Sequence, residues 1–271
     1  ADCANHTRLR TSGGRTRTQR GDTILATRIR DADKPTGRPC KRAGMDARRR
    51  PVNLYRARGN GQTSKSTQAM IELHNIDCME YLATCADNAF ELAIVDPPYG
   101  IDINSSGRLG HYGGKRKKWD SSTPDETYFK QITRVSVNQI VWGANYFQMP
   151  PTRCFLIWDK QQPQDVSFAS CEYAWTSFDQ SAKTYYQRPQ GADPYRIHPT
   201  QKPVKLYEWL LMKYAKEGDR ILDTHLGSGS IAIACHNLGF DLVGCELDTE
   251  YFNAAQKRLK QHQSQLRIPM Q

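Results

Sequence analysis

The sequence predicts an α/β fold in which buried strands end at a functional cleft. Leu92 to Val95 form a short apolar run rich in β-branched residues, which is typical of a buried strand. Residues 220–230 indicate a strand, a glycine turn and a helix that begins near Ile231, and residues 241–246 indicate another strand that ends in an acid. Because open α/β sheets bind ligands outside the carboxyl ends of their strands, we expect the site at these strand ends.

The other elements follow from their apolar patterns in chain order. We expect a strand at 71–74, a short helix opening at 77–82 with Asp77 as N-cap, a helix from Thr123 towards Val137, and strands at 139–143, 154–159 and 172–178, the last alternating as an antiparallel strand does. A helix with an apolar face of Leu206, Trp209, Leu210 and Tyr214 and an amphipathic helix from Glu250 to Gln263 complete the pattern.

A pair of prolines fixes the end of the strand at Leu92–Val95. Pro97 and Pro98 lack backbone donors, so the strand stops just after Asp96 and continues as a rigid extended segment to Tyr99. A carboxylate beside a rigidly held aromatic ring suits a planar base that carries an exocyclic amine. For these four residues alone, a proline turn with a surface tyrosine is the structural alternative.

A glycine turn follows the strand at 220–223. Gly227 and Gly229 let the backbone turn tightly and approach a ligand closely. Asp223, at the end of that strand, can accept a hydrogen bond from an ammonium group. Glu246 ends the next strand, about twenty residues on, where an acid suits the hydroxyls of a ribose.

Together these segments resemble the amino-group DNA methyltransferases that use S-adenosylmethionine. The Asp-Pro-Pro-Tyr segment precedes the glycine turn, as in their beta class of adenine N6 methyltransferases. The resemblance covers Ile71 to about Leu259. It implies a three-layer, Rossmann-like methyltransferase sandwich with a mostly parallel sheet, a circularly permuted motif order and a terminal antiparallel hairpin, in which the Val95 and Leu222 strands are neighbours.

The resemblance also implies roles for individual residues. The run from His198 to Pro203 matches the family's cofactor-carboxylate motif, so Thr200 and Lys202 would face the methionine carboxylate. Asp77 would accept from the cofactor's adenine amine, or serve only as a helix cap. Thr224 and His225 depart from the Pro and Phe usual in the family. The expected cofactor-binding residues are Asp77, Cys78, Thr200, Lys202, Asp223, His225, Gly227, Ser228, Gly229 and Glu246.

The expected catalytic residues are Asp96, Pro97, Pro98 and Tyr99. The resemblance implies direct methyl transfer to a flipped-out adenine, without a metal. Tyr99 would stack on the base, while Asp96 and the Pro97 carbonyl would accept hydrogen bonds from its amine. Alternatives are N4-cytosine methylation, which usually has Ser where Asp96 stands, RNA or protein-glutamine methylation, and a DNA-binding protein with a decayed site.

Positive charge is concentrated in two places. Residues 1–70 hold 17 Lys and Arg against 5 Asp and Glu, whereas the rest of the chain is slightly acidic. We interpret residues 1–69 as a disordered basic leader before a methyltransferase domain at 70–265. This leader is an upstream extension of the reading frame before Met70 or Met45, a basic arm for DNA phosphates, or a transit peptide.

Target recognition is expected in two loops, near 101–124 and 179–197. The first holds four adjacent cations, which indicate phosphate contacts or simply a solvated loop. His111, Tyr112 and Trp119 could stack on bases there. The expected DNA-binding residues are Lys115, Arg116, Lys117, Lys118, Arg188 and Arg196.

The remaining composition restricts the other classes of partner. The eight cysteines fit neither a zinc pattern nor a disulfide framework, and most lie in apolar runs, as reduced thiols do in a cytoplasmic protein. The leader has no apolar run long enough for a signal sequence or a membrane span. The resemblance implies double-stranded DNA as the partner and leaves open a homodimer and a cognate restriction endonuclease.

Overall fold

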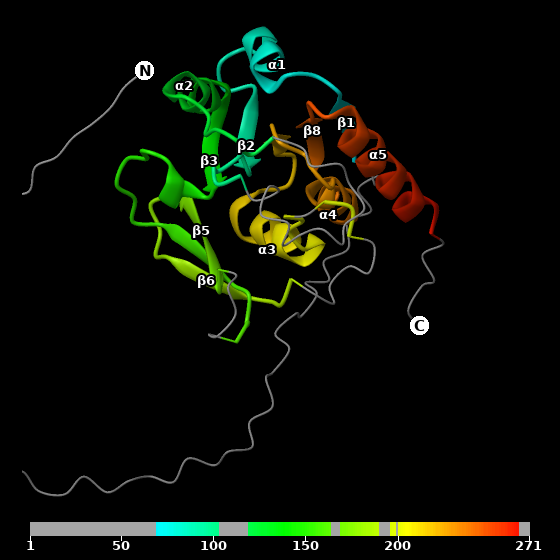
Figure 1. Ribbon diagram of the computed structural model, residues 1–271. Helices are drawn as coiled ribbons and strands as arrows, with labels where there is room; N and C mark the ends of the chain where they lie inside the picture. Colours follow the sequence, from blue (N-terminus) through cyan, green and yellow to red (C-terminus); the bar gives the residue numbers. More distant parts are fainter. Residues whose placement is uncertain (1–68, 103–118, 164–168, 190–195, 199, 266–271) are drawn as a thin grey trace, which may run out of the picture. The chain divides into compact units, whose positions relative to one another are not determined.

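The computed structural model describes residues 69–102, 119–163, 169–189, 196–198 and 200–265 (Figure 1). Residues 1–68 of the predicted leader, and the four cations Lys115, Arg116, Lys117 and Lys118, lie outside the described residues. Within the described part of the chain, no helix is both long enough and apolar enough to cross a membrane.

The described residues form one eight-stranded sheet in the order β1-β8-β7-β2-β3-β5-β4-β6. The strands are β1 (Ile71–His74), β2 (Phe90–Val95), β3 (Ser136–Trp142), β4 (Phe155–Asp159), β5 (Cys171–Thr176), β6 (Lys183–Tyr186), β7 (Arg220–Asp223) and β8 (Asp241–Cys245). The helices are α1 (Cys78–Thr84), α2 (Glu126–Val135), the 3-10 turn η1 (Ala144–Tyr146), α3 (Val204–Tyr214), α4 (Ser230–Leu238) and α5 (Thr249–Ser264).

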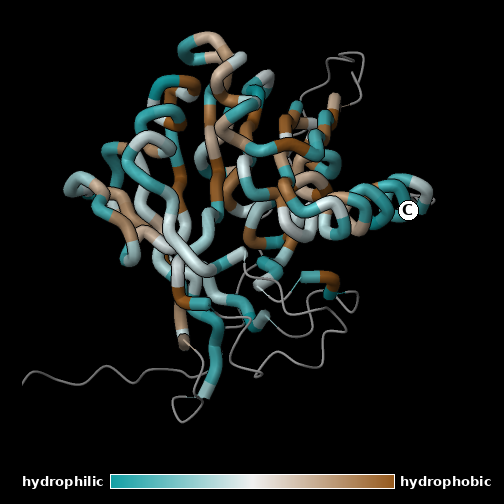
Figure 2. Tube along the Cα trace, turned by 45° about the horizontal axis from the view of Figure 1, so that its top comes forward, coloured by the Kyte–Doolittle hydropathy of each residue, from teal (hydrophilic) through white to brown (hydrophobic). Residues whose placement is uncertain are grey.

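The two faces of the sheet carry separate apolar clusters, which makes the fold a three-layer sandwich. Alternate residues of the central strands point to opposite faces: Leu92 and Ile94 pack with α3, α4 and α5, and Ala93 and Val95 pack with α1 and α2. Figure 2 shows hydrophobic residues along the central strands and hydrophilic residues along the outside of α5. The predicted architecture is confirmed.

The parallel part of the sheet brings the predicted site segments together. β2 pairs in parallel with β7, with Leu92 opposite Ile221 and Ala93 opposite Leu222, so the strands of Val95 and Leu222 are neighbours as predicted. β7 pairs in parallel with β8, and β8 with β1. The carboxyl ends of these strands therefore lie along one edge of the sheet.

The other end of the sheet contains antiparallel strands. β5 pairs antiparallel with both β3 and β4, which supplies the expected hairpin. β6 adds a strand parallel to β4 where the sequence indicated only a polar, aromatic recognition segment. The helix expected to run towards Val137 ends at Val135, because the backbone from Ser136 onward pairs with β2 as β3.

Candidate active site

Two cavities meet at the carboxyl end of β2. The larger, of about 570 Å³, extends over the ends of β7 and β8, and the smaller, of about 290 Å³, extends towards η1 and β5. The larger volume lies within the usual range for small-molecule and cofactor sites. The residues that line both cavities are Asp96, Pro98, Trp119, Thr200 and Lys202.

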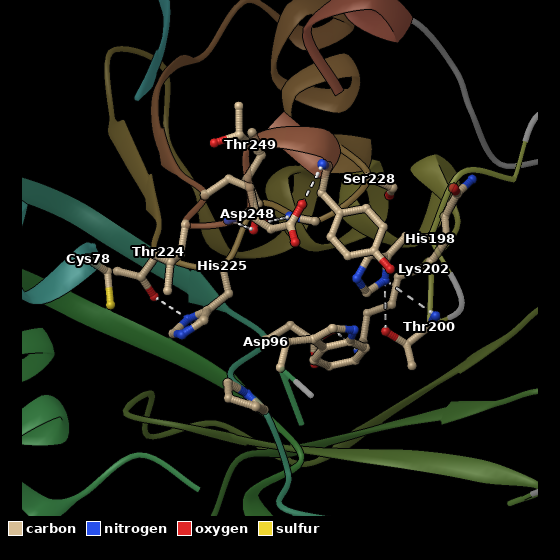
Figure 3. A pocket seen from close by; sticks show the side chains of 18 of the residues that line it. Cys78, Asp96, His198, Thr200, Lys202, Thr224, His225, Ser228, Asp248 and Thr249 are labelled. Atoms are coloured by element: carbon tan, nitrogen blue, oxygen red, sulfur yellow. Dashed lines mark hydrogen bonds and ion pairs between the residues drawn. The ribbon is translucent and has the colours of Figure 1, made fainter. Parts of the chain in front are cut away.

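The larger cavity is lined by most of the residues predicted to bind a cofactor. Figure 3 shows Thr224 and His225 on one side of the pocket, His198 and Thr200 on the other, and Asp96 between them. The predicted residues that line it are Asp77, Cys78, Thr200, Lys202, His225, Gly227, Ser228 and Glu246. Asp223 and Gly229 are buried and do not line it, so direct contact between these two residues and a cofactor gains no support from the cavity.

The carboxylate of Glu246 holds the glycine turn against the end of β8. Its Oε2 accepts from the backbone N–H of Gly227 at 2.8 Å, and its Oε1 accepts from that of Asp248 at 2.9 Å. Gly227 has φ +52° and faces the cavity, where a side chain would be in ordinary contact with His198. The acid therefore shapes the cavity wall as well as lining it.

Gly229 serves the packing of two helices. It is the N-cap of α4 with φ +69°, and a Cβ there would lie 3.1 Å from the Cβ of Ala255 in α5. A larger residue at this position would strain the backbone and displace α5. Asp223 is also structural in part: its Oδ1 accepts from the His225 backbone N–H at 3.0 Å, and burial raises the pKa of its carboxyl to about 8.

A chain of hydrogen bonds crosses from α2 to the larger cavity through the two residues that depart from the family pattern. The hydroxyls of Tyr128 and Thr224 are 2.7 Å apart, and the Thr224 hydroxyl is 2.9 Å from Nδ1 of His225. Burial lowers the pKa of His225 to about 4, so the imidazole is neutral near neutral pH. A neutral ring thus occupies the place of the usual Phe.

Asp77 caps α1 and also lines the larger cavity. Its Oδ1 accepts from the Met79 backbone N–H at 2.7 Å, which fulfils the predicted capping role. The same side chain borders the cavity beside Cys78. Burial raises the pKa of the Cys78 thiol to about 12, so this cysteine is protonated and unreactive.

Asp96 lies at the junction of the two cavities and makes two charge-assisted contacts. The Tyr99 hydroxyl donates to its Oδ1 at 2.6 Å, and the Lys202 ammonium pairs with its Oδ2. Lys202 also lies 3.0 Å from Oε2 of Glu172, whose Oε1 is 2.7 Å from the Lys160 ammonium. Lys202 was expected to face a cofactor carboxylate, but here it pairs with two carboxylates of the protein.

The ring of Tyr99 is held in place by glycine and aromatic neighbours. Gly143, with φ +71°, packs so closely that a Cβ there would overlap the Tyr99 ring atoms. Tyr146 stacks on Tyr99 with ring centroids 5.1 Å apart and planes 14° apart. The backbone N–H groups of Tyr99 and Gly100 donate to Oδ1 of Asp120 at 2.6 and 2.9 Å, which fixes the turn after the prolines.

The two predicted arginines of the second recognition loop do not line either cavity. Arg188 is exposed, and Arg196 is half-buried, with its Nε 3.3 Å from the His198 carbonyl. Their contact with DNA stays a prediction. Among the described residues, no group of His, Cys, Asp and Glu is arranged to hold a metal ion.

Sequence reasoning missed four residues that shape the site: Asp120, Gly143, Lys160 and Glu172. Glu172 occupies a polar position in an alternating strand, which on its own indicates only solvent exposure. The pairing of β5 with β3 and β4 brings it to Asp96. Gly143 directly follows a buried strand, and that position was the one local signal for a close backbone approach.

Comparison with known proteins finds that part of this chain is similar to a family of DNA-modifying enzymes. Residues 141–257 match the DNA methylase family, which covers both N6 and N4 methyltransferases. The match contains Gly143, Glu172, Lys202, the glycine turn and Glu246, and therefore includes walls of both cavities.

Two known proteins are similar to parts of this chain. The type II methyltransferase M2.DpnII of Streptococcus pneumoniae is 43% identical over 63 residues, which are 23% of this chain and 24% of that protein. The chain therefore matches about a quarter of that relative's length. The putative methylase YubD of Escherichia coli K12 is 26% identical over 207 residues, which are 68% of this chain and 87% of that protein.

A solved structure supports the fold. The PvuII DNA methyltransferase, which is cytosine-N4-specific, aligns with a TM-score of 0.51 and 12% identity over 71% of this chain and 87% of that one. At this identity the likeness concerns the fold alone. It agrees with the mixed, mostly parallel sheet described above.

Proposed function

We propose that this protein transfers a methyl group from S-adenosylmethionine to the N6 amine of an adenine flipped out of double-stranded DNA. The observation that carries the proposal is the junction of the two cavities at Asp96. A donor in the larger cavity and a base in the smaller one would meet at this carboxylate. A paired base cannot reach such a junction, so it must leave the helix.

The polar and apolar groups that line the larger cavity suit S-adenosylmethionine. Glu246 places a carboxylate beside the glycine turn, where ribose hydroxyls can donate to it, and Gly227 brings the backbone close. Asp77 and Thr200 add polar groups to the walls, and Leu247 and Tyr251 add apolar surface. When bound there, the cofactor supplies an activated methyl group.

The smaller cavity suits a flipped base. Tyr99 and Tyr146 present aromatic rings, and Asp96 and Pro97 line the same cavity, where the carboxylate and the Pro97 carbonyl would accept hydrogen bonds from an exocyclic amine. These hydrogen bonds would orient the amine towards the donor and give its departing proton an acceptor. Orientation at a fixed distance supplies most of the acceleration in this scheme.

Adenine is proposed over cytosine because Asp stands at position 96, where cytosine N4 enzymes usually have Ser. The family covers both reactions, so this choice rests on one residue. N4-cytosine methylation is the second candidate, and both use the same architecture. A homodimer and a cognate restriction endonuclease remain predictions from the resemblance.

The proposal is tested by expression of the full chain in a host that lacks DNA methylation, followed by sequencing of the host DNA for modified bases. We expect N6-methyladenine within one recurring sequence. The Asp96→Asn variant is the matched negative control. N4-methylcytosine in place of methyladenine would support the second candidate, and unmodified DNA together with absent cofactor binding by calorimetry would refute both.

A further inference from the structure

Four charged side chains from distant parts of the chain form a cluster on the wall of the smaller cavity, here called the Lys202 cluster. Asp96 follows β2, Lys160 follows β4, Glu172 lies in β5, and Lys202 precedes α3. The Lys202 side chain is 2% exposed, whereas those of Asp96 and Glu172 are 18% and 19% exposed. The buried ammonium therefore depends on these carboxylates for compensation.

The contacts within the Lys202 cluster are shared unequally. Lys202 pairs with both Asp96 and Glu172, while Glu172 has a second cation, Lys160, at 2.7 Å. The Lys202 ammonium also lies 3.3 Å from the Tyr99 hydroxyl and 5.3 Å from the centre of the Trp142 ring. Glu172 is thus held in place by Lys160. Because it also pairs with Lys202, the Lys202 ammonium stabilises the Asp96 carboxylate less than it would if the two were paired alone.

The consequence concerns the basicity of Asp96. A buried ammonium that served Asp96 alone would stabilise the carboxylate and make it a poor proton acceptor. A second carboxylate on the same ammonium offsets that stabilisation. Tyr99 and Lys202 contact Asp96 directly. The other titratable groups that interact with it electrostatically are Tyr128, Glu172, Tyr207 and Asp223.

We propose that Glu172, anchored by Lys160, is a positioning residue that shares the Lys202 ammonium with Asp96 and so keeps Asp96 able to take the proton of the target amine. This inference rests on the proposed function. In the transfer step the amine nitrogen bonds to the methyl carbon, and the methyl–sulfur bond of the cofactor breaks with its electron pair left on sulfur. An N–H proton passes to Asp96, and Lys202 then remains paired with Glu172.

The charges of the two acids agree with this division of roles. Burial raises the pKa of Glu172, but Lys202 and Lys160 outweigh it and lower that pKa to about 2, so Glu172 stays ionised. Burial also raises the pKa of Asp96; Lys202 opposes this shift and Glu172 adds to it. Asp96 is therefore the carboxylate of the pair that protonates first.

The first test measures single-turnover methyl transfer to duplex DNA as a function of pH for the wild type and for Glu172→Gln. Loss of the second carboxylate should lower the pKa of Asp96, so the acid limb of the profile should move to lower pH and the plateau rate should fall about tenfold. Glu172→Asp should restore part of both. Asp179→Asn, which removes an exposed ion pair with Arg153, is the matched control and should leave the profile unchanged.

Binding measurements separate positioning from other roles. The affinities of Glu172→Gln for S-adenosylmethionine and for duplex DNA should stay within about threefold of the wild type. Threefold is about 0.7 kcal/mol, since 1.4 kcal/mol corresponds to tenfold. The inference would be overturned if the pH profile of Glu172→Gln kept both the acid limb and the plateau of the wild type. It would also be overturned if the plateau fell while the acid limb stayed at the same pH. A wild type without transfer would instead contradict the proposed function.

A second test is independent of activity. The melting temperatures of Asp96→Asn, Glu172→Gln and the double variant form a cycle around Lys202. Either single variant leaves one carboxylate for the buried ammonium, whereas the double variant leaves none, so the double variant should lose more than the sum of the single losses. Additive losses would show that the two acids do not share Lys202 and would overturn the inference.

Discussion

Among single residues, the carboxyl group of Asp96 is the one on which the proposed reaction depends. It lies where both cavities meet and is held by the Tyr99 hydroxyl and the Lys202 ammonium. Asp96→Asn keeps the shape of the side chain but removes its charge and its ability to take a proton. We expect methyl transfer to fall by about 10²- to 10⁴-fold, the usual contribution of a general base.

The same variant should bind S-adenosylmethionine nearly as well as the wild type, because Asp96 is assigned to the amine of the base. Calorimetry measures this affinity and a labelled-methyl assay measures transfer. Asp159→Asn, at the end of β4, is a control in which an acid outside both cavities is changed. Near-normal turnover by Asp96→Asn would show that the assigned mechanism is wrong.

His225 gives a prediction for stability as a function of pH. Its pKa is lowered from 6.5 to about 4, so between these values the unfolded chain binds a proton that the folded protein does not. Stability should therefore fall as the pH drops through this window. His225→Phe removes the titrating group. As the pH falls through this window, the melting temperature of the variant should therefore rise relative to that of the wild type. A difference in melting temperature between the two proteins that stays the same at all pH values would contradict a neutral imidazole in the folded protein.

At the scale of elements, the turn after β3 fixes Tyr99. Gly143→Ala should push the Tyr99 ring away from its place because the new Cβ would overlap it. We expect methyl transfer to fall by about 10²-fold, as when reacting groups are misplaced by an ångström, with cofactor affinity unchanged. Normal transfer would show that Tyr99 is not held by this contact.

Gly218→Ala is the matched control for Gly143→Ala. Gly218 has φ +88°, and a Cβ there would meet nothing within 4 Å. Both variants therefore carry the strain of a left-handed alanine, about 1–2 kcal/mol, but only one has the clash. Loss of transfer in both variants would assign the effect to stability.

The elements predicted well from sequence are those with strong apolar patterns. β1 begins and ends where expected, and α5 extends one residue beyond the prediction at each end. β6 was missed because its four residues, Lys183–Tyr186, are mostly exposed and carry no periodic pattern; pairing with β4 makes them a strand. Thr and Tyr favour strands, but four residues without an alternating apolar pattern do not predict a strand on their own.

The site was predicted in the same uneven way. Segments with distinctive local chemistry, such as the prolines after Asp96 and the glycine turn, were identified from sequence and do border the cavities. Glu172 and Asp120 were not, because each carboxylate acquires its role from a partner at least 20 residues away in the chain. The distribution of charge on Lys202 likewise follows from topology and could not be read from the run His198 to Pro203.

At the scale of the whole molecule, the two basic regions predicted from sequence have different expected roles. Neutralising Lys115, Arg116, Lys117 and Lys118 together should weaken DNA binding and flatten its salt dependence, because each lost phosphate contact removes close to one unit from the slope of log affinity against log salt. Cofactor affinity should not change. Binding titrations at several salt concentrations measure both.

Deletion of residues 1–69 is the comparison for that variant. The segment has too few apolar residues to contribute to a core, so we expect methyl transfer and its sequence preference to be retained. If the deletion abolished DNA binding while the variant with all four cations neutralised bound normally, the roles of the two regions would have been assigned the wrong way round.

The proposed reaction is methylation of the exocyclic amine of adenine in DNA at the junction of the two cavities. The most direct measurement is transfer of a labelled methyl group from S-adenosylmethionine to duplexes in which only adenines or only cytosines carry an available target amine. We expect label in the adenine duplexes as N6-methyladenine and no label with Asp96→Asn. Label confined to the cytosine duplexes, or equal labelling by wild type and Asp96→Asn, would contradict it.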